Sequence, residues 1–154
     1  MVDVHTIASF ISLRYEYQYG SRIDEMKLHI LLYFMQRECI VQTGNPLFEA
    51  TFYAHTFGPY LPEVHAAYIS NSLHDVLPSN IIEEYKTIFD SVFELLSAKK
   101  TRSLSNLIHG EGSWKRAMMQ GEGTPMDVKE DATRFRVRRF LLSNLEQFHK
   151  PVYV

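Results

Sequence analysis

Cysteine is nearly absent from the sequence, since Cys39 is the only one among 154 residues. A single cysteine excludes an internal disulfide bond and any metal site of the CxxC type. Long apolar runs are missing as well: the most apolar stretch, residues 26–41, is interrupted by Lys27, His29 and Arg37. A membrane helix needs about 18 or more apolar residues in succession. The N-terminus has no basic segment followed by an apolar core, so we expect a cytoplasmic protein without a signal peptide.

A strong charge of either sign is also lacking, because the formal net charge is −2. Such a chain has no global field that would attract nucleic acid or an acidic membrane. The apolar content of 45% and the charged content of 22% are ordinary for a globular protein. The length predicts a single domain over residues 1–154, long enough to bury about 70% of its unfolded surface.

The stretch around which the rest is predicted to pack is a helix over residues 24–43. Its apolar residues cover nearly the whole circumference of a helix, which is typical of a helix enclosed by others. Ser21 lies three residues before Asp24 in an approximate capping arrangement, and Gly44 can end the helix in the left-handed conformation. Asn45-Pro46 then prevents its continuation.

A short β element is predicted next. Apolar and polar residues alternate from Leu47 to Thr56, the pattern of a half-buried strand. Gly58-Pro59 is predicted to turn the chain into a further helix, for which Pro62 suits the first turn.

The remaining apolar spacing predicts amphipathic helices. They cover residues 2–15, 81–96, 101–109, 114–119 and about 127–149, with capping boxes at Asn80/Glu83 and Asp127/Glu130. The fold class is therefore a predominantly helical α+β domain. It has six or seven helices around residues 24–43 and a small β element at about 47–56.

Sequence patterns for catalysis or metal binding are weak. The seven histidines form no HExxH motif, and the glycines at 110, 112, 121 and 123 fit no phosphate-binding loop. His109-Gly110-Glu111 matches half of a zinc deaminase signature, but a single cysteine cannot supply the other half. We therefore expect no enzyme, no cofactor and no metal. A small enzyme with an unrecognised site near His109 and Glu111 remains an alternative.

Two stretches are candidates for binding a partner. One runs from His109 to Arg116 and includes Trp114; tryptophan and arginine are common at interface hot spots. Trp114 can equally anchor a short helix to the core, with His109 bonded to a nearby carbonyl group. The other stretch holds Arg134, Arg136, Arg138 and Arg139 among apolar residues. It could contact nucleic-acid phosphates, although the net charge favours a solvated face or a protein partner.

Three passages together resemble a known family. They are 26–36 (MKLHILLYFMQ), 43–48 (TGNPLF) through 57–64 (FGPYLPEV), and 104–109 (LSNLIH) with Trp114-Lys115. Their order is similar to that of the Panacea domain of SocA-like or GepA-like antitoxins, often found in prophages and other mobile elements. Phe57 stands where the family more often has tyrosine. The arginine-rich helix at about 127–149 has no clear family counterpart.

The resemblance implies an antitoxin that neutralises a cognate toxin by direct protein–protein binding, without catalytic residues. Tyr60, His109, Trp114 and Arg116 are the predicted contact residues. The alternatives are a nucleic-acid-binding regulator that uses the four arginines, and the small enzyme. No membrane partner is expected, and a homo-oligomer remains possible.

Overall fold

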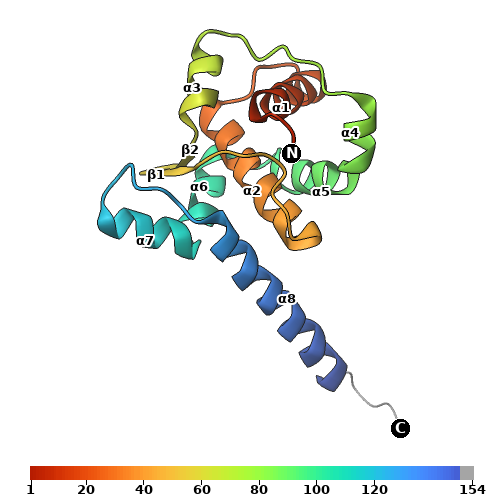
Figure 1. Ribbon diagram of the computed structural model, residues 1–154, viewed down its shortest axis with the longest axis vertical. Coiled ribbons are helices and arrows are strands. Elements are labelled where there is room, and N and C mark those ends of the chain that lie inside the picture. The colour runs from red at the N-terminus through yellow and green to blue at the C-terminus, as the bar shows by residue number, and fades with distance from the viewer. Residues whose placement is uncertain (150–154) are drawn as a thin grey trace.

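One helix, α2 (Glu25–Thr43), runs through the middle of the protein, and the other elements surround it (Figure 1). The computed structural model describes residues 1–149, with side chains as far as residue 145. The neighbours of α2 include α1 (Val4–Tyr19), α3 (Pro62–Ile69), α5 (Lys86–Leu96), α6 (Thr101–His109) and α8 (Val128–His149). The remaining helices are α4 (Ser79–Glu84) and α7 (Gly112–Gln120). The predominantly helical α+β class is confirmed.

The predicted central helix is confirmed almost to the residue, although its N-terminal cap is not the predicted one. The Asp24 side chain, rather than Ser21, accepts a hydrogen bond from the Lys27 backbone amide at 3.3 Å. Gly44 ends the helix in the left-handed conformation, with φ at 78°. The predicted Asp127 cap is also present, because its carboxylate accepts the Glu130 amide at 3.1 Å.

The β element is shorter than predicted and lies later in the chain. Strands β1 (Tyr53–His55) and β2 (Gly58–Tyr60) pair antiparallel, with Tyr53 opposite Tyr60. The residues predicted as a turn thus form the second strand. The other edge of β1 pairs with the loop before α8, where the Ala54 amide donates to the Thr124 carbonyl at 2.9 Å.

Two helix predictions were wrong in extent. Helix α1 continues to Tyr19, through residues predicted as a connector. The Tyr15 and Tyr19 rings pack on neighbouring helices, and the Tyr19 hydroxyl lies 2.8 Å from that of Ser97, whereas Tyr17 is exposed. The helix predicted over residues 81–96 is divided at Tyr85, whose φ of −106° and ψ of 14° depart from helical values. Residues 1–149 therefore hold eight helices.

The capping box predicted at Asn80 and Glu83 is also absent. Helix α4 begins at Ser79, two residues earlier than predicted, after Pro78, and no side chain caps it. None of the helices in the described part of the chain is long and apolar enough to cross a membrane.

Gln36 on α2 fixes the chain that follows the helix. Its side chain is almost fully buried. The Gln36 amide nitrogen donates to the Phe48 carbonyl at 2.7 Å, and its oxygen accepts the Leu47 amide at 2.8 Å and the Phe48 amide at 3.2 Å. One side chain thus satisfies three backbone groups in a segment without helical or strand hydrogen bonds, which explains why residues 47–52 stay ordered without being a strand.

Gln36→Leu is expected to lower the free energy of unfolding by about 2–4 kcal/mol, because it leaves buried backbone groups without partners. Urea denaturation followed by circular dichroism measures the change. The control is Gln42→Leu on the exposed side of the same helix, which loses a bond to Glu38 and is expected to cost less than about 0.5 kcal/mol. Equal losses in the two variants would contradict the role given to Gln36.

Candidate partner-binding surface

His109 and Trp114 meet at the β-hairpin. Their rings stack with centroids 4.3 Å apart. The indole N–H of Trp114 donates to the His55 carbonyl at 2.9 Å, and His109 Nε2–H donates to the Thr56 carbonyl at 2.9 Å. Both residues are half-buried. The pair therefore clamps the hairpin onto α6 and α7, so each ring has a structural role beside any role in binding.

Tyr60 lies on the other side of the same hairpin, within a group of histidines. Its ring stacks on that of His55 with a centroid distance of 4.3 Å. His29 and His65 lie slightly farther from the Tyr60 ring, at 5.3 and 5.4 Å. Three of the four predicted contact residues, Tyr60, His109 and Trp114, are thus brought together around the hairpin.

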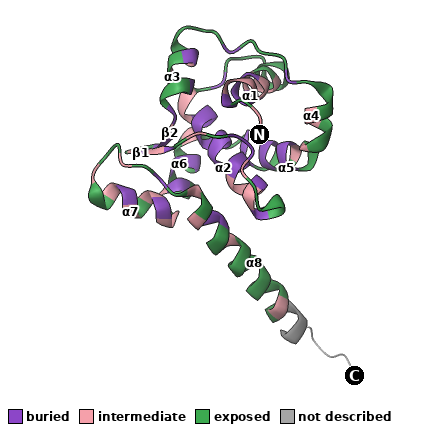
Figure 2. Ribbon diagram, in the orientation of Figure 1, coloured by how far each residue is buried: buried purple, intermediate pink, exposed green. Residues whose placement is uncertain are grey.

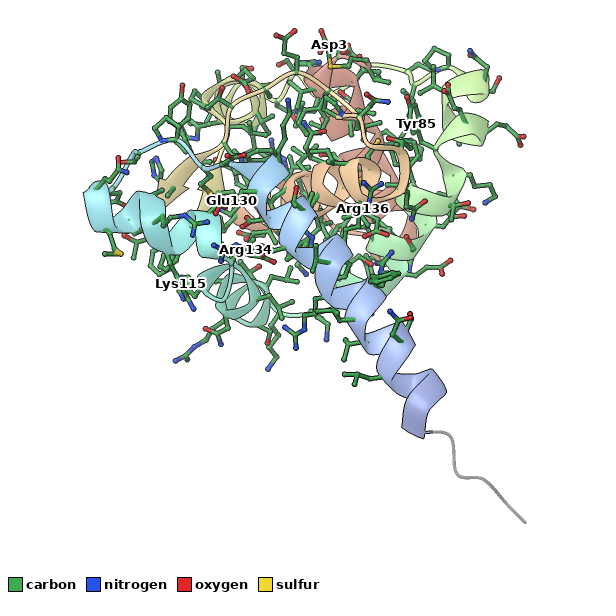
Figure 3. All side chains as sticks on the ribbon, turned by 60° about the horizontal axis from the view of Figure 1, so that its bottom comes forward. Asp3, Tyr85, Lys115, Glu130, Arg134 and Arg136 are labelled. Carbon is green, nitrogen blue, oxygen red and sulfur yellow. The ribbon has the colours of Figure 1, made fainter. Side chains whose placement is uncertain are left out.

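Arg116, the fourth predicted contact residue, points away from the hairpin. It forms an ion pair with Glu130 on α8, and Arg134 approaches the same carboxylate at 3.2 Å. Figure 3 shows Glu130 and Arg134 on α8, close to α7, which carries Lys115. His109 on α6 and Trp114 on α7 therefore face the hairpin, whereas Arg116 faces α8.

A groove lies beside the hairpin. Its volume is about 590 Å³, and we call it the hairpin groove; it is lined by Met26, Phe57, Thr101, Arg102, Ser105, Asn106 and His109. Phe57, at the turn of the hairpin, is 66% exposed. The turn is held close to α2, since a Cβ added at Gly58 would lie 3.2 Å from the Met26 sulfur. The groove thus combines an exposed aromatic ring with polar side chains, beside a hairpin turn that packs closely against α2.

Phe57 was missing from the contact residues predicted from sequence. A single aromatic residue before Gly-Pro gives no periodic signal that would distinguish a buried ring from an exposed one. Its only sequence signal was the position within the family-like passage 57–64.

His109 and Glu111, the residues suggested for an unrecognised enzyme, do not share one pocket. His109 borders the hairpin groove. Glu111 forms an ion pair with Arg37 and lines a separate cavity of about 340 Å³ with Asp131 and Arg134. Burial raises the pKa of Glu111, and the Arg37 charge opposes that rise. The two side chains do not converge on a common substrate position.

The four arginines of the basic stretch do not form one continuous face. Residues on a helix are separated by about 100° each, so Arg134 and Arg138 share one side of α8, whereas Arg136 and Arg139 point in other directions. Arg136 donates to the Val41 carbonyl at 2.9 Å, and Arg139 lies 3.4 Å from Glu38. Several of these charges are thus used within the chain, which leaves little support for a phosphate-binding row.

Glu25 connects two of the histidines near Tyr60. His29 Nε2–H and His65 Nδ1–H donate to the same Glu25 oxygen, at 2.9 and 2.8 Å. His29 Nδ1 accepts the Leu61 amide at 3.2 Å, so this buried ring is held in its neutral form. Among the described residues, no group of three or more histidine, cysteine or acidic side chains is arranged to hold a metal ion.

Comparison with known protein families gives one match. A family model described as "Antitoxin SocA-like, Panacea domain" matches residues 28–115, which are 88 of the 154 residues. The matched range includes most of α2, the hairpin, α6 and the start of α7, and so contains the hairpin groove except for Met26. Comparisons with curated proteins and with solved structures gave no match.

The buried His29 is expected to make stability depend on pH. Burial lowers the pKa of His29 below its ordinary value of 6.5, and the hydrogen bond to Glu25 opposes this only in part. Below pH 6.5 the unfolded chain gains a proton that the folded chain resists. Stability should therefore fall as the pH drops from 6.5 to the folded pKa, with a limiting slope of about 1.4 kcal/mol per pH unit.

Urea denaturation between pH 7.5 and 5 measures this slope. The pKa of Glu25 is lowered by its histidine hydrogen bonds, against an opposing effect of burial, so its own contribution is lost only below pH 4.5. His29→Gln is expected to flatten the profile, whereas the control His74→Gln, at an exposed histidine, keeps the wild-type profile. Identical profiles for wild type and His29→Gln would rule out His29 as the source.

Proposed function

Since the chain belongs to the SocA-like antitoxin family with the Panacea domain, we propose that it neutralises a cognate toxin by binding it directly. The toxin would be a protein encoded beside this chain, in a gene pair of the kind that prophages and other mobile elements carry. The proposal needs no catalytic step, cofactor or nucleic acid. The family membership is the observation that carries it.

We propose the hairpin groove as the toxin-binding site. The exposed Phe57 ring offers an apolar anchor, and Arg102 and Asn106 are exposed on the adjoining turns of α6. An apolar anchor surrounded by polar groups is the usual composition of an interface hot spot and its rim. The groove also lies largely in the part of the chain that the family model matches.

The sequence-predicted contact residues have different roles in this proposal. His109 borders the groove, and with Trp114 it holds the hairpin that presents Phe57. Tyr60 supports the hairpin from its other side through His55. Arg116 forms its ion pair with α8 and would contact the toxin only at the margin.

We also propose that residues 1–154 act as one domain. A single cluster of buried apolar residues extends from Val4 on α1 to Met126, just before α8. α8 lies outside the family match but is attached to this core through the buried Ala132 and Asp131. Residues 150–154 lie outside the described part of the chain.

The product of the adjacent gene is the first partner to test. That product alone is expected to stop growth, and co-expression with this chain should restore growth and yield one complex on co-purification. A harmless neighbour, or one that does not bind, would contradict the antitoxin function.

Phe57→Ser tests the site separately from the function. It is expected to weaken toxin binding by about 30-fold, which corresponds to about 2 kcal/mol for loss of a hot-spot ring. Isothermal titration calorimetry on the purified complex partners measures the affinity. Leu95→Ser is the control, because Leu95 on α5 is also exposed, at 70%, and lies away from the groove. Wild-type affinity for Phe57→Ser would place the toxin elsewhere while leaving the antitoxin function intact.

A further inference from the structure

The second half of α8 extends beyond the rest of the protein. Figure 1 shows the helix leaving the body, and Figure 2 shows that its far half is mostly exposed. The first half is firmly attached: the buried Asp131 accepts hydrogen bonds from the Tyr33 hydroxyl and the Ser113 backbone amide, the latter at 2.9 Å. Arg136 adds a bond to the end of α2. The protruding part is therefore held in a fixed direction.

The protruding part carries an apolar face that nothing in the described chain covers. Val137, Phe140, Leu141, Leu142 and Leu145 are each between 51% and 64% exposed. At about 100° per residue, Val137, Leu141 and Leu145 lie within an arc of about 80°, with Phe140 beside them, whereas Leu142 lies next to Phe135 on the α2 side. The α2 side of the helix, marked by Ala132, Phe135 and Arg139, lies on the opposite face. We call the exposed side the α8 apolar face.

We propose that the α8 apolar face binds the same face of a second copy of this chain, in an antiparallel pair with its two-fold axis near Leu141. Such a contact is isologous, as in most two-fold dimers. Val137 of one copy would then lie near Leu145 of the other, and the two Leu141 side chains would meet at the centre.

The distribution of charge along α8 favours a second copy of the chain as the partner and an antiparallel orientation of the two helices. Arg134, Arg136, Arg138 and Arg139 all precede Leu141, whereas residues 140–145 carry no charge. In a parallel pair each arginine would lie beside the same arginine of the second chain, and the two positive charges would repel each other. In the antiparallel pair the two Arg138 positions are about 9 Å apart along the axis and the two Arg134 positions about 21 Å, so the arginines of one copy do not lie against those of the other. The opposed helix dipoles favour the same arrangement.

The area is sufficient for a reversible dimer. With roughly 150–200 Å² for a complete large apolar side chain, the four residues on this face, Val137, Phe140, Leu141 and Leu145, expose roughly 330–440 Å² in each copy. A patch of that size commonly marks an interaction site. The two patches with the adjoining arginine stems reach about 1,000 Å², the lower end of specific interfaces, so the dimer should dissociate on dilution.

The bodies of the two copies do not compete for this space. Each body packs on the side of α8 that faces away from the apolar face, because α2 contacts Phe135 and Arg139. In the antiparallel pair the bodies therefore lie at opposite ends and on opposite outer sides.

The mass of the purified full chain tests the proposal. Sedimentation equilibrium over a wide concentration range is expected to show a transition from 18.0 kDa to twice that mass. Leu141→Glu would place two carboxylates at the axis and is expected to raise the dimer dissociation constant by about 30-fold or more. Leu95→Glu, at the exposed Leu95 of α5, should leave the dimer unchanged, and circular dichroism verifies that both variants are folded.

Cysteine cross-linking tests the direction. Two Val137 positions in the antiparallel pair are about 12 Å apart along the axis, beyond the reach of a disulfide. Val137→Cys alone should therefore not cross-link, whereas a mixture of Val137→Cys and Leu145→Cys should. The native Cys39 is buried and does not interfere. Efficient cross-linking of Val137→Cys alone would overturn the antiparallel arrangement.

Other occupants would give different results. A wild-type chain that stays monomeric at every concentration overturns the dimer. If Leu141→Glu then abolishes binding of the neighbouring gene product, the face belongs to the toxin. If instead the monomer sediments with anionic phospholipid vesicles and Leu141→Glu does not, the face belongs to a membrane. Loss of neutralisation in Phe57→Ser with an intact dimer would separate this face from the hairpin groove.

Discussion

The fold depends on the burial of most of α2, because each polar side chain that is buried with the helix needs a hydrogen-bond partner on a neighbouring element. The Lys27 ammonium group donates to the Ser97 carbonyl at the end of α5, at 3.0 Å. His29 accepts the amide before α3, and Gln36 holds the segment after the helix. Tyr33 bonds to Asp131 on α8. An unsatisfied buried polar group costs about 1–3 kcal/mol, so each bond fixes a different neighbour at one position along α2.

At the proposed binding surface, the residues that hold the hairpin in place differ from those that face outward and could contact a partner. Gly58 brings the hairpin turn against Met26 on α2, and Trp114 and His109 hold the hairpin through its backbone carbonyl groups. Because backbone acceptors are independent of side-chain identity, residues facing outward from the hairpin and α6 can change while the frame remains. Phe57, which is 66% exposed at the turn of the hairpin, occupies such an outward-facing position.

The sequence allowed the prediction of the helices and of their general arrangement, because those follow from local patterns. The all-round apolar residues of 24–43 and the Gly44 stop were sufficient for α2. The β-hairpin was only partly predictable, since Gly58-Pro59 has the composition of a turn, and β2 exists because β1 pairs with it. The division at Tyr85 also has no local signal. In the site, the nearness of His109 and Trp114 was predictable from their spacing. Their attachment to residues more than fifty positions earlier was not.

The arginines of α8 are consecutive or nearly so in the sequence but make separate contacts in the helix. In sequence, residues 134–139 are a basic stretch suited to phosphates. In the helix, Arg134 shares Glu130 with Arg116, Arg136 binds the end of α2, and Arg139 approaches Glu38, so these charges attach α8 to the body. The same charges end where the exposed apolar residues begin to dominate. A helix whose arginines all lie on one side of an apolar centre has an electrostatic reason to pair antiparallel with a second copy. The stretch that suggested nucleic acid thus argues, in three dimensions, for a protein contact.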